Sequence, residues 1–308
     1  MIFIDKSTNK VLGDQVVKDY LDNCCLDTVT GRYSNVCYDK RDGYGNRFSS
    51  TNMGIYKKRM IDAIYRNQHG YCCYCLRKLN KKASNGGIEK ISLEHIIPRG
   101  YDNTNNARLA DYQAAPNLNI GDVILREDFE KNTNQDTPPY PHNVAYNNLV
   151  ASCLGNFPDE KNGRSPMCCN GIRKEKYAYP AYYLTDIQQY IYYGVNGEII
   201  VKASICHHDD VWACVSSAKL YIRPLKDIRR LWYELRHVNY RDIYNCQDEI
   251  ARHKLLSSTL TNMNLEDKKK FVQKFKSEDF WNTFMLYRKF YSIMNRLYPK
   301  LHGIKTRK

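Results

Sequence analysis

Apolar residues recur at intervals of three and four in two parts of the chain, which predicts amphipathic helices there. These helices lie before residue 70 and after residue 218. They span Lys10 to Leu26, Met53 to Asn67, Lys219 to Val238, Asp242 to Leu260, Glu266 to Phe275 and Glu278 to Tyr298. Asn264 and Ser277 stand just before the last two and are predicted N-caps, because their side chains accept hydrogen bonds from the first backbone amides of a helix.

Short β-prone runs predict strands in the middle of the chain. Ile88 to Ile97 is stopped by Pro98, which cannot donate a ladder hydrogen bond. Asn147 to Cys153 gives a second strand, and Glu198 to Ile205 alternates after the turn signal Asn196-Gly197. A short helix is predicted for Asn170 to Lys176. Strands in the middle and helices after them predict an α+β fold with a mostly α-helical C-terminal region.

Charge is unevenly distributed over the 308 residues. The 47 Lys and Arg exceed the 33 Asp and Glu by 14, and the excess is concentrated after residue 218. A basic surface attracts polyphosphate without reading sequence, although an ordinary solvated face is the alternative. No apolar run approaches the roughly 18 residues that span a bilayer, and the first residues lack signal-peptide character. We therefore expect a cytoplasmic protein without a membrane partner.

The twelve cysteines favour metal over disulfides, because the cytosol is reducing and one pair has C-x-x-C spacing. Two cysteine clusters on either side of the first strand can close a tetrahedral zinc site. We expect a structural zinc ion held by Cys72, Cys75, Cys153 and Cys169. Cys168 is adjacent to Cys169, and either could be the fourth thiolate. The run from Cys206 to Asp210 is interpreted as an exposed loop.

Glu94 and His95 form the chemically notable pair of the chain, because they stand next to each other in the first predicted strand. Adjacent strand residues point to opposite faces. We therefore expect a bend or bulge at this pair if both side chains are to share one site.

Together these residues resemble a known family, the HNH endonucleases. The resemblance rests on C-x-Y-C from Cys72, E-H-I-I-P from Glu94, N-L-x-x-S-C from Asn148 and C-N-x-x-R from Cys169. More narrowly, the chain resembles the HNH proteins encoded beside an ATPase in bacterial anti-phage systems of the Septu and retron-associated types. The additional cues are Gln-His-Gly at residues 68–70 and the sequence from Tyr193 to Ile199.

The resemblance implies a ββα-metal core stapled by a zinc knuckle. It covers residues 55–204, the predicted nuclease domain, after an N-terminal extension of residues 1–54 and before a basic helical region of residues 205–308. Residues 101–146 are rich in Asn and contain four prolines, and compact members of the family have far fewer residues here. Loops of this length are usually functional or disordered, so this insertion leaves the position of the substrate groove open.

The resemblance also implies roles for individual residues. His95 would be the general base, and Asn148 would pin the loop whose backbone carbonyl orients it. Glu94 and Asn170 would hold one catalytic Mg²⁺ or Mn²⁺, for which oxygen ligands are suited. Asn170 stands where many members of the family have a histidine.

Arg99 and Arg173 are predicted to bind phosphates flanking the scissile bond. We therefore expect a metal-dependent endonuclease that acts on nucleic acid, with DNA favoured and RNA open. It would be the nuclease effector of an anti-phage complex, with an ATPase partner contacted in part by the C-terminal helices. The alternatives are a non-catalytic zinc-stabilised adaptor that binds nucleic acid or protein, and a stand-alone restriction-type nuclease.

Overall fold

The computed structural model describes residues 1, 3–39, 47–49, 54–81, 91–99, 122–132, 139–157, 166–173, 179–203, 208–246, 248–260, 263–290 and 293. Within these residues the strands form four two-stranded sheets, and helices make up much of the rest. The predicted mixture of helix and small sheet is confirmed. No helix among the described residues combines the length and the apolar character needed to cross a membrane.

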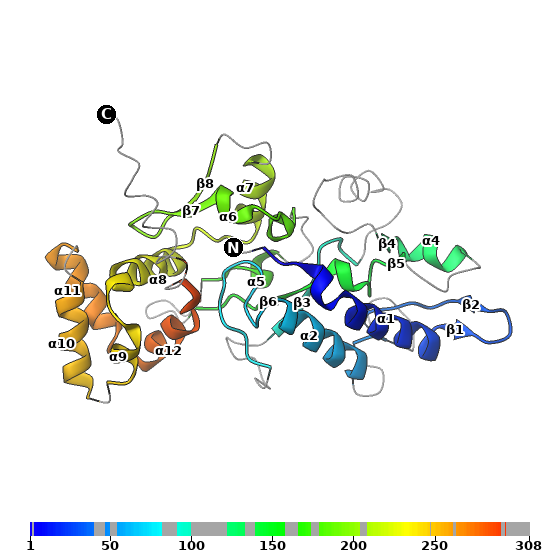
Figure 1. Ribbon diagram of the computed structural model, residues 1–308, viewed down its shortest axis with the longest axis horizontal. Helices are drawn as coiled ribbons and strands as arrows, with labels where there is room; N and C mark the ends of the chain where they lie inside the picture. Colours follow the sequence, from blue (N-terminus) through cyan, green and yellow to red (C-terminus); the bar gives the residue numbers. More distant parts are fainter. Residues whose placement is uncertain are drawn as a thin grey trace.

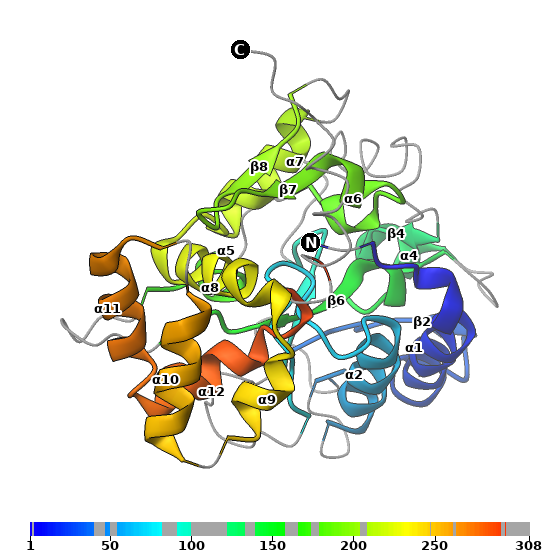
Figure 2. The same ribbon diagram turned by 60° about the vertical axis from the view of Figure 1, so that its left-hand side comes forward.

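The described elements up to residue 173 are mostly short. They are η1 (Lys6–Asn9), α1 (Lys10–Cys24), β1 (Leu26–Asp27), β2 (Arg32–Tyr33), α2 (Ile55–Asn67), β3 (Ile91–His95), β4 (Val123–Ile124), α4 (Arg126–Lys131), β5 (Tyr140–Pro141), η5 (Tyr146–Asn148), β6 (Leu149–Cys153) and α5 (Asn170–Arg173). The antiparallel pair β3–β6 lies between the N-terminal helices α1 and α2 on one side and the C-terminal helices on the other (Figures 1 and 2).

The later elements form a hairpin and a helical array. They are η6 (Ala181–Tyr183), α6 (Ile187–Tyr190), β7 (Ile191–Tyr193), β8 (Ile199–Val201), α7 (His208–Ser217), α8 (Arg223–Glu234), η7 (Leu235–His237), α9 (Tyr240–Tyr244), α10 (Glu249–Thr259), α11 (Leu265–Lys274) and α12 (Glu278–Leu286). Asn264 and Ser277 accept hydrogen bonds from the first amides of α11 and α12, as predicted.

Three predictions for the helical region are wrong. The helix expected from Glu278 to Tyr298 is shorter, because α12 ends at Leu286 with Tyr287 as its C-cap. The single helix expected over 242–260 is interrupted, because the Asp248 side chain accepts a hydrogen bond from the Ile250 amide and starts α10 anew. The run expected to be an exposed loop up to Asp210 is in fact the start of α7 from His208 onward. Asp209 and Asp210 then lie in the first turn of α7, where negative charge favours a helix.

The free edge of β6 is covered by the end of α2 rather than by another strand. The Gln68 side chain accepts a hydrogen bond from the Ala151 amide (2.8 Å) and donates one to the Ala151 carbonyl (2.8 Å), to which the Cys73 amide also donates (3.1 Å). A side-chain amide thus satisfies backbone groups that would otherwise be unpaired in the core. This contact places the Cys72–Cys75 turn beside the end of β6.

The N-terminal segment packs directly on this core. The Lys6 ammonium is buried and donates hydrogen bonds to the carbonyls of Tyr146 (3.0 Å) and Leu149 (2.5 Å), at the start of β6. Burial lowers the pKa of Lys6 well below its ordinary value. Buried residues from all three predicted segments belong to one hydrophobic cluster, so the divisions expected at 54 and 204 do not separate independent cores.

The predicted insertion at 101–146 is partly structured. Its interior, including residues 101–121 and 133–138, lies outside the described residues. The described remainder contains the parallel pair β4–β5 and α4, whose first amide, at Arg126, donates to His142 Nδ1 (3.1 Å). His142 is buried, at 2% exposure.

Candidate metal centre and catalytic site

Four cysteine sulfurs from three separate segments converge at the end of β6. Cys72 and Cys75 come from the turn after α2, Cys153 ends β6, and Cys169 directly precedes α5. All four side chains are buried, and their sulfurs lie within 4.8 Å of one another. A tetrahedral zinc site with Zn–S bonds of about 2.3 Å would place its sulfurs about 3.8 Å apart. The sulfurs of Cys75 and Cys153 are 3.6 Å apart and those of Cys72 and Cys169 are 3.9 Å apart.

The backbone around these sulfurs forms a tight turn and supplies one hydrogen bond to a sulfur. The Cys153 amide donates a hydrogen bond to the Cys72 sulfur (3.3 Å), and the Leu76 amide closes the first turn on the Cys72 carbonyl (3.2 Å). Leu76 adopts a left-handed conformation (φ 62°), which the turn requires despite its cost for a non-glycine residue. The four buried cysteines therefore lie close enough to bind a metal ion, and their donor set suits a structural zinc ion.

The position of Cys169 makes it the better candidate for the fourth ligand than Cys168. Among the described residues, the group of ligand atoms that converges includes Cys169. The Cys168 sulfur is 3.3 Å from the Cys169 sulfur. The close approach of this loop to the end of β6 requires glycine at 155, because a Cβ there would lie 1.8 Å from the Cys168 carbonyl oxygen.

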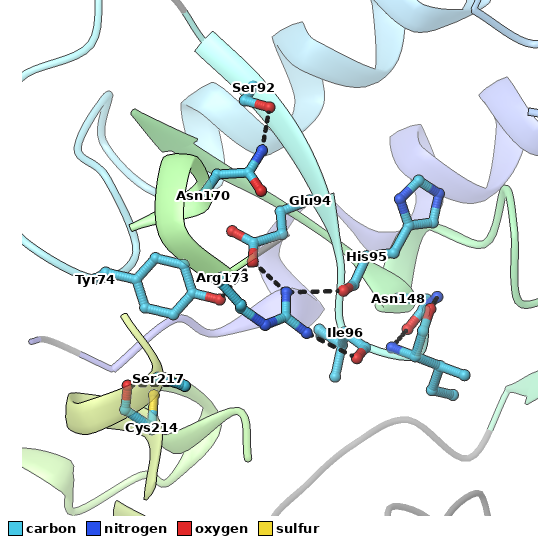
Figure 3. Close-up of polar contacts among 11 residues, drawn as sticks. Tyr74, Ser92, Glu94, His95, Ile96, Asn148, Asn170, Arg173, Cys214 and Ser217 are labelled. Atoms are coloured by element: carbon cyan, nitrogen blue, oxygen red, sulfur yellow. Dashed lines mark hydrogen bonds and ion pairs between the residues drawn. The ribbon is translucent and has the colours of Figure 1, made fainter. Parts of the chain in front are cut away.

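Glu94 is buried beside this centre and is not free in solvent. Its Oε1 accepts a hydrogen bond from the Tyr74 hydroxyl (2.9 Å) and forms an ion pair with Arg173. The Arg173 guanidinium also donates to the carbonyls of His95 (3.0 Å) and Ile96 (3.1 Å), which joins α5 to the end of β3 (Figure 3). Arg173 is 1% exposed. The predicted phosphate contact of Arg173 is therefore wrong, because its donors serve the interior.

Replacing Arg173 with methionine is expected to lower the free energy of unfolding by about 3–5 kcal/mol, because Glu94 would remain buried without its countercharge. Urea unfolding of the zinc-loaded protein would measure the change. Arg99→Met is the matched control, since the partly exposed pair of Arg99 with Asp39 is worth about 0–1 kcal/mol. Equal losses in the two variants would contradict this interpretation of Arg173.

The second carboxylate oxygen of Glu94 is unpaired within the described part of the chain. Glu94 Oε2 is buried and meets no hydrogen-bond partner among the described residues, a costly state for a carboxylate. Asn170, the first residue of α5, donates through its amide nitrogen to Ser92 Oγ (2.5 Å), which leaves its amide oxygen as an acceptor. Figure 3 shows the Asn170 and Glu94 side chains on the same side of β3. Both groups offer oxygen, the type of ligand that Mg²⁺ or Mn²⁺ takes in proteins.

The His95 ring projects from the other face of β3 (Figure 3). The register of β3 with β6 runs without interruption through Glu94 and His95, so the expected bulge is absent. His95 Nε2 lies 2.9 Å from the Asn143 carbonyl oxygen. A carbonyl can only accept, so Nε2 carries the hydrogen and Nδ1 keeps the lone pair. Burial lowers the pKa of His95 to about 3, which makes the ring neutral at pH 7.

Asn148 holds the loops on both sides of His95. Its Oδ1 accepts from the Ile97 amide (2.7 Å), while its Nδ2 donates to the carbonyls of Ile97 (3.0 Å) and His142 (2.6 Å). Asn148 thus connects the turn after β3 to the segment that contains His142. The carbonyl of the next residue in that segment, Asn143, accepts the hydrogen bond from His95. Asn143 itself is anchored through its Nδ2 to the Val36 carbonyl (2.9 Å).

Arg99 lies on the His95 side of the strand and pairs with Asp39, with its guanidinium over the Tyr38 ring. The Tyr38 ring in turn packs edge-on against His95 at 4.5 Å between ring centroids. The contact of Arg99 with a phosphate stays a prediction. Sequence reasoning missed Tyr74, Ser92 and Asn143. Ser92 and Glu94 are two residues apart in a strand and so face the same side, which could have indicated Ser92. No local pattern in the sequence marks Asn143.

Comparison with known proteins identifies no relative. The chain matches no protein-family model, no curated protein and no solved structure. The residues of the two sites are therefore what indicates a function.

Proposed function

We propose that this protein is a metal-dependent endonuclease of the HNH type, with β3, β6 and α5 as its ββα-metal core and zinc as its staple. DNA is the proposed substrate. The observation that carries the proposal is the arrangement around His95: a neutral imidazole whose tautomer is set by a carbonyl, in a loop that Asn148 holds. A zinc module that serves only for stability has no use for such a histidine.

Phosphodiester hydrolysis needs a base that takes a proton from the attacking water. His95 Nδ1 has the lone pair for this, and general-base assistance of this kind is worth roughly 10²–10⁴-fold in rate. The proton would reside on Nδ1, and the imidazolium would be stabilised through Nε2–H by the Asn143 carbonyl. The negative charge of a bound phosphodiester would raise the pKa of His95 from its low value and make it a more effective acceptor.

Glu94 Oε2 and the Asn170 amide oxygen would hold a divalent cation. That cation supplies Lewis-acid stabilisation of the phosphoryl oxygens and of the leaving 3′ oxygen. Because His95 and Glu94 point to opposite faces, the substrate backbone would have to cross the end of β3 to meet both. Arg173 serves this arrangement indirectly, by fixing the Glu94 carboxylate and the carbonyl of His95 at the strand end.

The basic C-terminal region is the proposed surface for nucleic acid or for an ATPase partner. Lys269, Lys270, Lys276 and Arg288 are exposed on or near α11 and α12. Such a surface would bring in polyphosphate in a salt-dependent manner. We propose that the protein is the nuclease effector of an anti-phage complex and that these helices contact the ATPase in part.

The proposal is tested by incubating the protein with supercoiled plasmid, single-stranded DNA or RNA, with Mg²⁺, Mn²⁺ or EDTA. Each reaction is run with and without the ATPase encoded beside it, if one is found. Cutting that needs a divalent cation supports the proposal, and the substrate that is cut names the substrate class. Cutting without the partner would favour a stand-alone nuclease. Absence of cutting under every condition, with zinc bound, would contradict the proposal.

Asn148→Asp is expected to reduce cleavage by about 10²-fold, because a small displacement of a catalytic group has an effect of that size. The change keeps an acceptor for the Ile97 amide but places a carboxylate against the carbonyls of Ile97 and His142. Rates of plasmid nicking would measure it. Asn282→Asp, an exposed position on α12, is the matched control. Cleavage unchanged in both variants would remove Asn148 from the catalytic arrangement.

A second candidate is a zinc-stabilised adaptor that binds nucleic acid or protein without cutting. The burial of Glu94 and its ion pair with Arg173 favour it, since both stabilise a folded module without any reaction. This candidate requires nucleic-acid binding with no nicking, and binding that survives Glu94→Gln. The nuclease requires that Glu94→Gln weaken metal-dependent cleavage.

A further inference from the structure

Arg77 is a fully buried arginine next to the cysteine centre. It follows the Cys72–Cys75 turn by two residues and is 0% exposed. Its Nη1 donates to the Asn156 carbonyl (3.0 Å), three residues after Cys153. Its guanidinium lies over the ring of Phe157, 4.6 Å from the centroid. Arg77 therefore joins the segment of the first two sulfurs to the segment of the third.

Tyr287 brings the C-terminal helices to the same place. Its hydroxyl accepts a hydrogen bond from Arg77 Nε (2.9 Å) and donates to the Cys75 sulfur (3.7 Å). The Tyr287 ring stacks on Phe157 at 6.1 Å, and the Lys78 amide donates to the Leu286 carbonyl (2.8 Å).

The charge of a loaded centre explains why a guanidinium would be buried here. Four thiolates around Zn²⁺ leave a net charge of about −2, and a buried charge is costly unless it is compensated. Arg77 supplies one positive charge close to these sulfurs. The hydrogen bond from the Tyr287 hydroxyl to the Cys75 sulfur would further delocalise the negative charge of that thiolate. Groups that bond to metal ligands in this way commonly set metal affinity.

We propose that Arg77 and Tyr287 form the outer shell of the cysteine centre, so that retention of zinc depends on the docking of the C-terminal end of α12. The role does not depend on nuclease activity. It makes the C-terminal region part of the metal site, although that region contributes no ligand. A partner that displaces α12 would then also lower the affinity of the centre for zinc.

The test uses the full-length zinc-loaded protein and follows zinc transfer to excess chromogenic chelator. Arg77→Met is expected to release zinc about 10- to 100-fold faster, the usual size of such outer-shell effects. Arg77→Lys keeps the positive charge, so its zinc release should be slower than that of Arg77→Met. The rate of zinc release from Tyr287→Phe should lie between those of wild type and Arg77→Met. Tyr20→Phe is the matched control, because it removes an equally buried hydroxyl that bonds to the Cys37 carbonyl instead.

Cobalt substitution separates this role from general destabilisation. Loss of a cation next to thiolates raises the energy of their electrons, so the thiolate-to-cobalt charge-transfer band should move to longer wavelength in Arg77→Met and Tyr287→Phe but not in Tyr20→Phe. If Arg77→Met does not fold, Tyr287→Phe decides the matter. Zinc release and a cobalt band equal to wild type in the folded variants would overturn the proposal, whatever the result of the nuclease assays.

Discussion

His95→Ala is expected to reduce metal-dependent cleavage by about 10²–10⁴-fold while the protein keeps its zinc. The Asn143 carbonyl accepts from Nε2 of this imidazole, which leaves the lone pair on Nδ1, and burial lowers the pKa of His95 to about 3, so the ring is neutral. Its loss removes the proton acceptor and leaves Glu94 and the cysteine centre in place. Initial rates of plasmid nicking at saturating metal would measure the effect.

The control for this variant is His208→Ala, since His208 lies at the start of α7 and its ring contacts Asp209. Zinc content and thermal melting of both variants would establish that each is folded. Cleavage by His95→Ala at the wild-type rate would refute the proposed mechanism even if the protein is a nuclease. A loss of cleavage in both variants would point to damage that is not specific to the base.

Cys75→Ser is expected to abolish zinc binding and to unfold the segment from β3 to α5. Structural zinc contributes about 10–16 kcal/mol in small zinc-binding peptides, as much as the roughly 5–15 kcal/mol that stabilises a whole domain. The β3–β6 pair is only two strands, so it depends on the cysteine centre and on Gln68 for its position. Zinc analysis, thermal melting and amide exchange in β3, β6 and α5 would measure the loss.

Cys214→Ser is the matched control. This thiol is buried on α7 outside the cluster, and burial raises its pKa to about 12, so it is an uncharged core group. Its replacement should cost stability without loss of zinc. A chelator should destabilise wild type and Cys214→Ser to the same extent. A Cys75→Ser protein that melts as wild type does and is indifferent to chelator would exclude a structural metal.

Features set by neighbouring residues were predictable from the sequence. The caps Asn264 and Ser277 act on amides three residues away, and the helices that they start begin at nearly the predicted positions, although α12 ends at Leu286 and not at Tyr298. The interruption before α10 was missed, although Asp248 is the same kind of signal, because the apolar spacing continues across it. α7 was missed because the polar run Cys206–Asp210 hides its first turn.

The metal centre was predictable in kind but not in full. The C-x-x-C spacing places Cys72 and Cys75 in one local turn. A zinc site needs four ligands, so cysteines from later segments were expected to join them. The choice between Cys168 and Cys169 needed the path of the chain into α5, because only the tertiary structure shows that the converging group of sulfurs includes Cys169.

The sequence by itself determined where most of the helices begin, the caps of α11 and α12, the C-x-x-C turn and the order of the candidate site residues. These depend on contacts within a few residues along the chain. Only the tertiary structure decided which charged groups are buried: Arg173 pairs with Glu94 across 79 positions, and Arg77 meets Tyr287 across 210. Whether an arginine faces water, a phosphate or a carboxylate depends on partners that local patterning does not specify. It was decided by the packing of α5 against the end of β3 and of α12 against the cysteine centre at the end of β6.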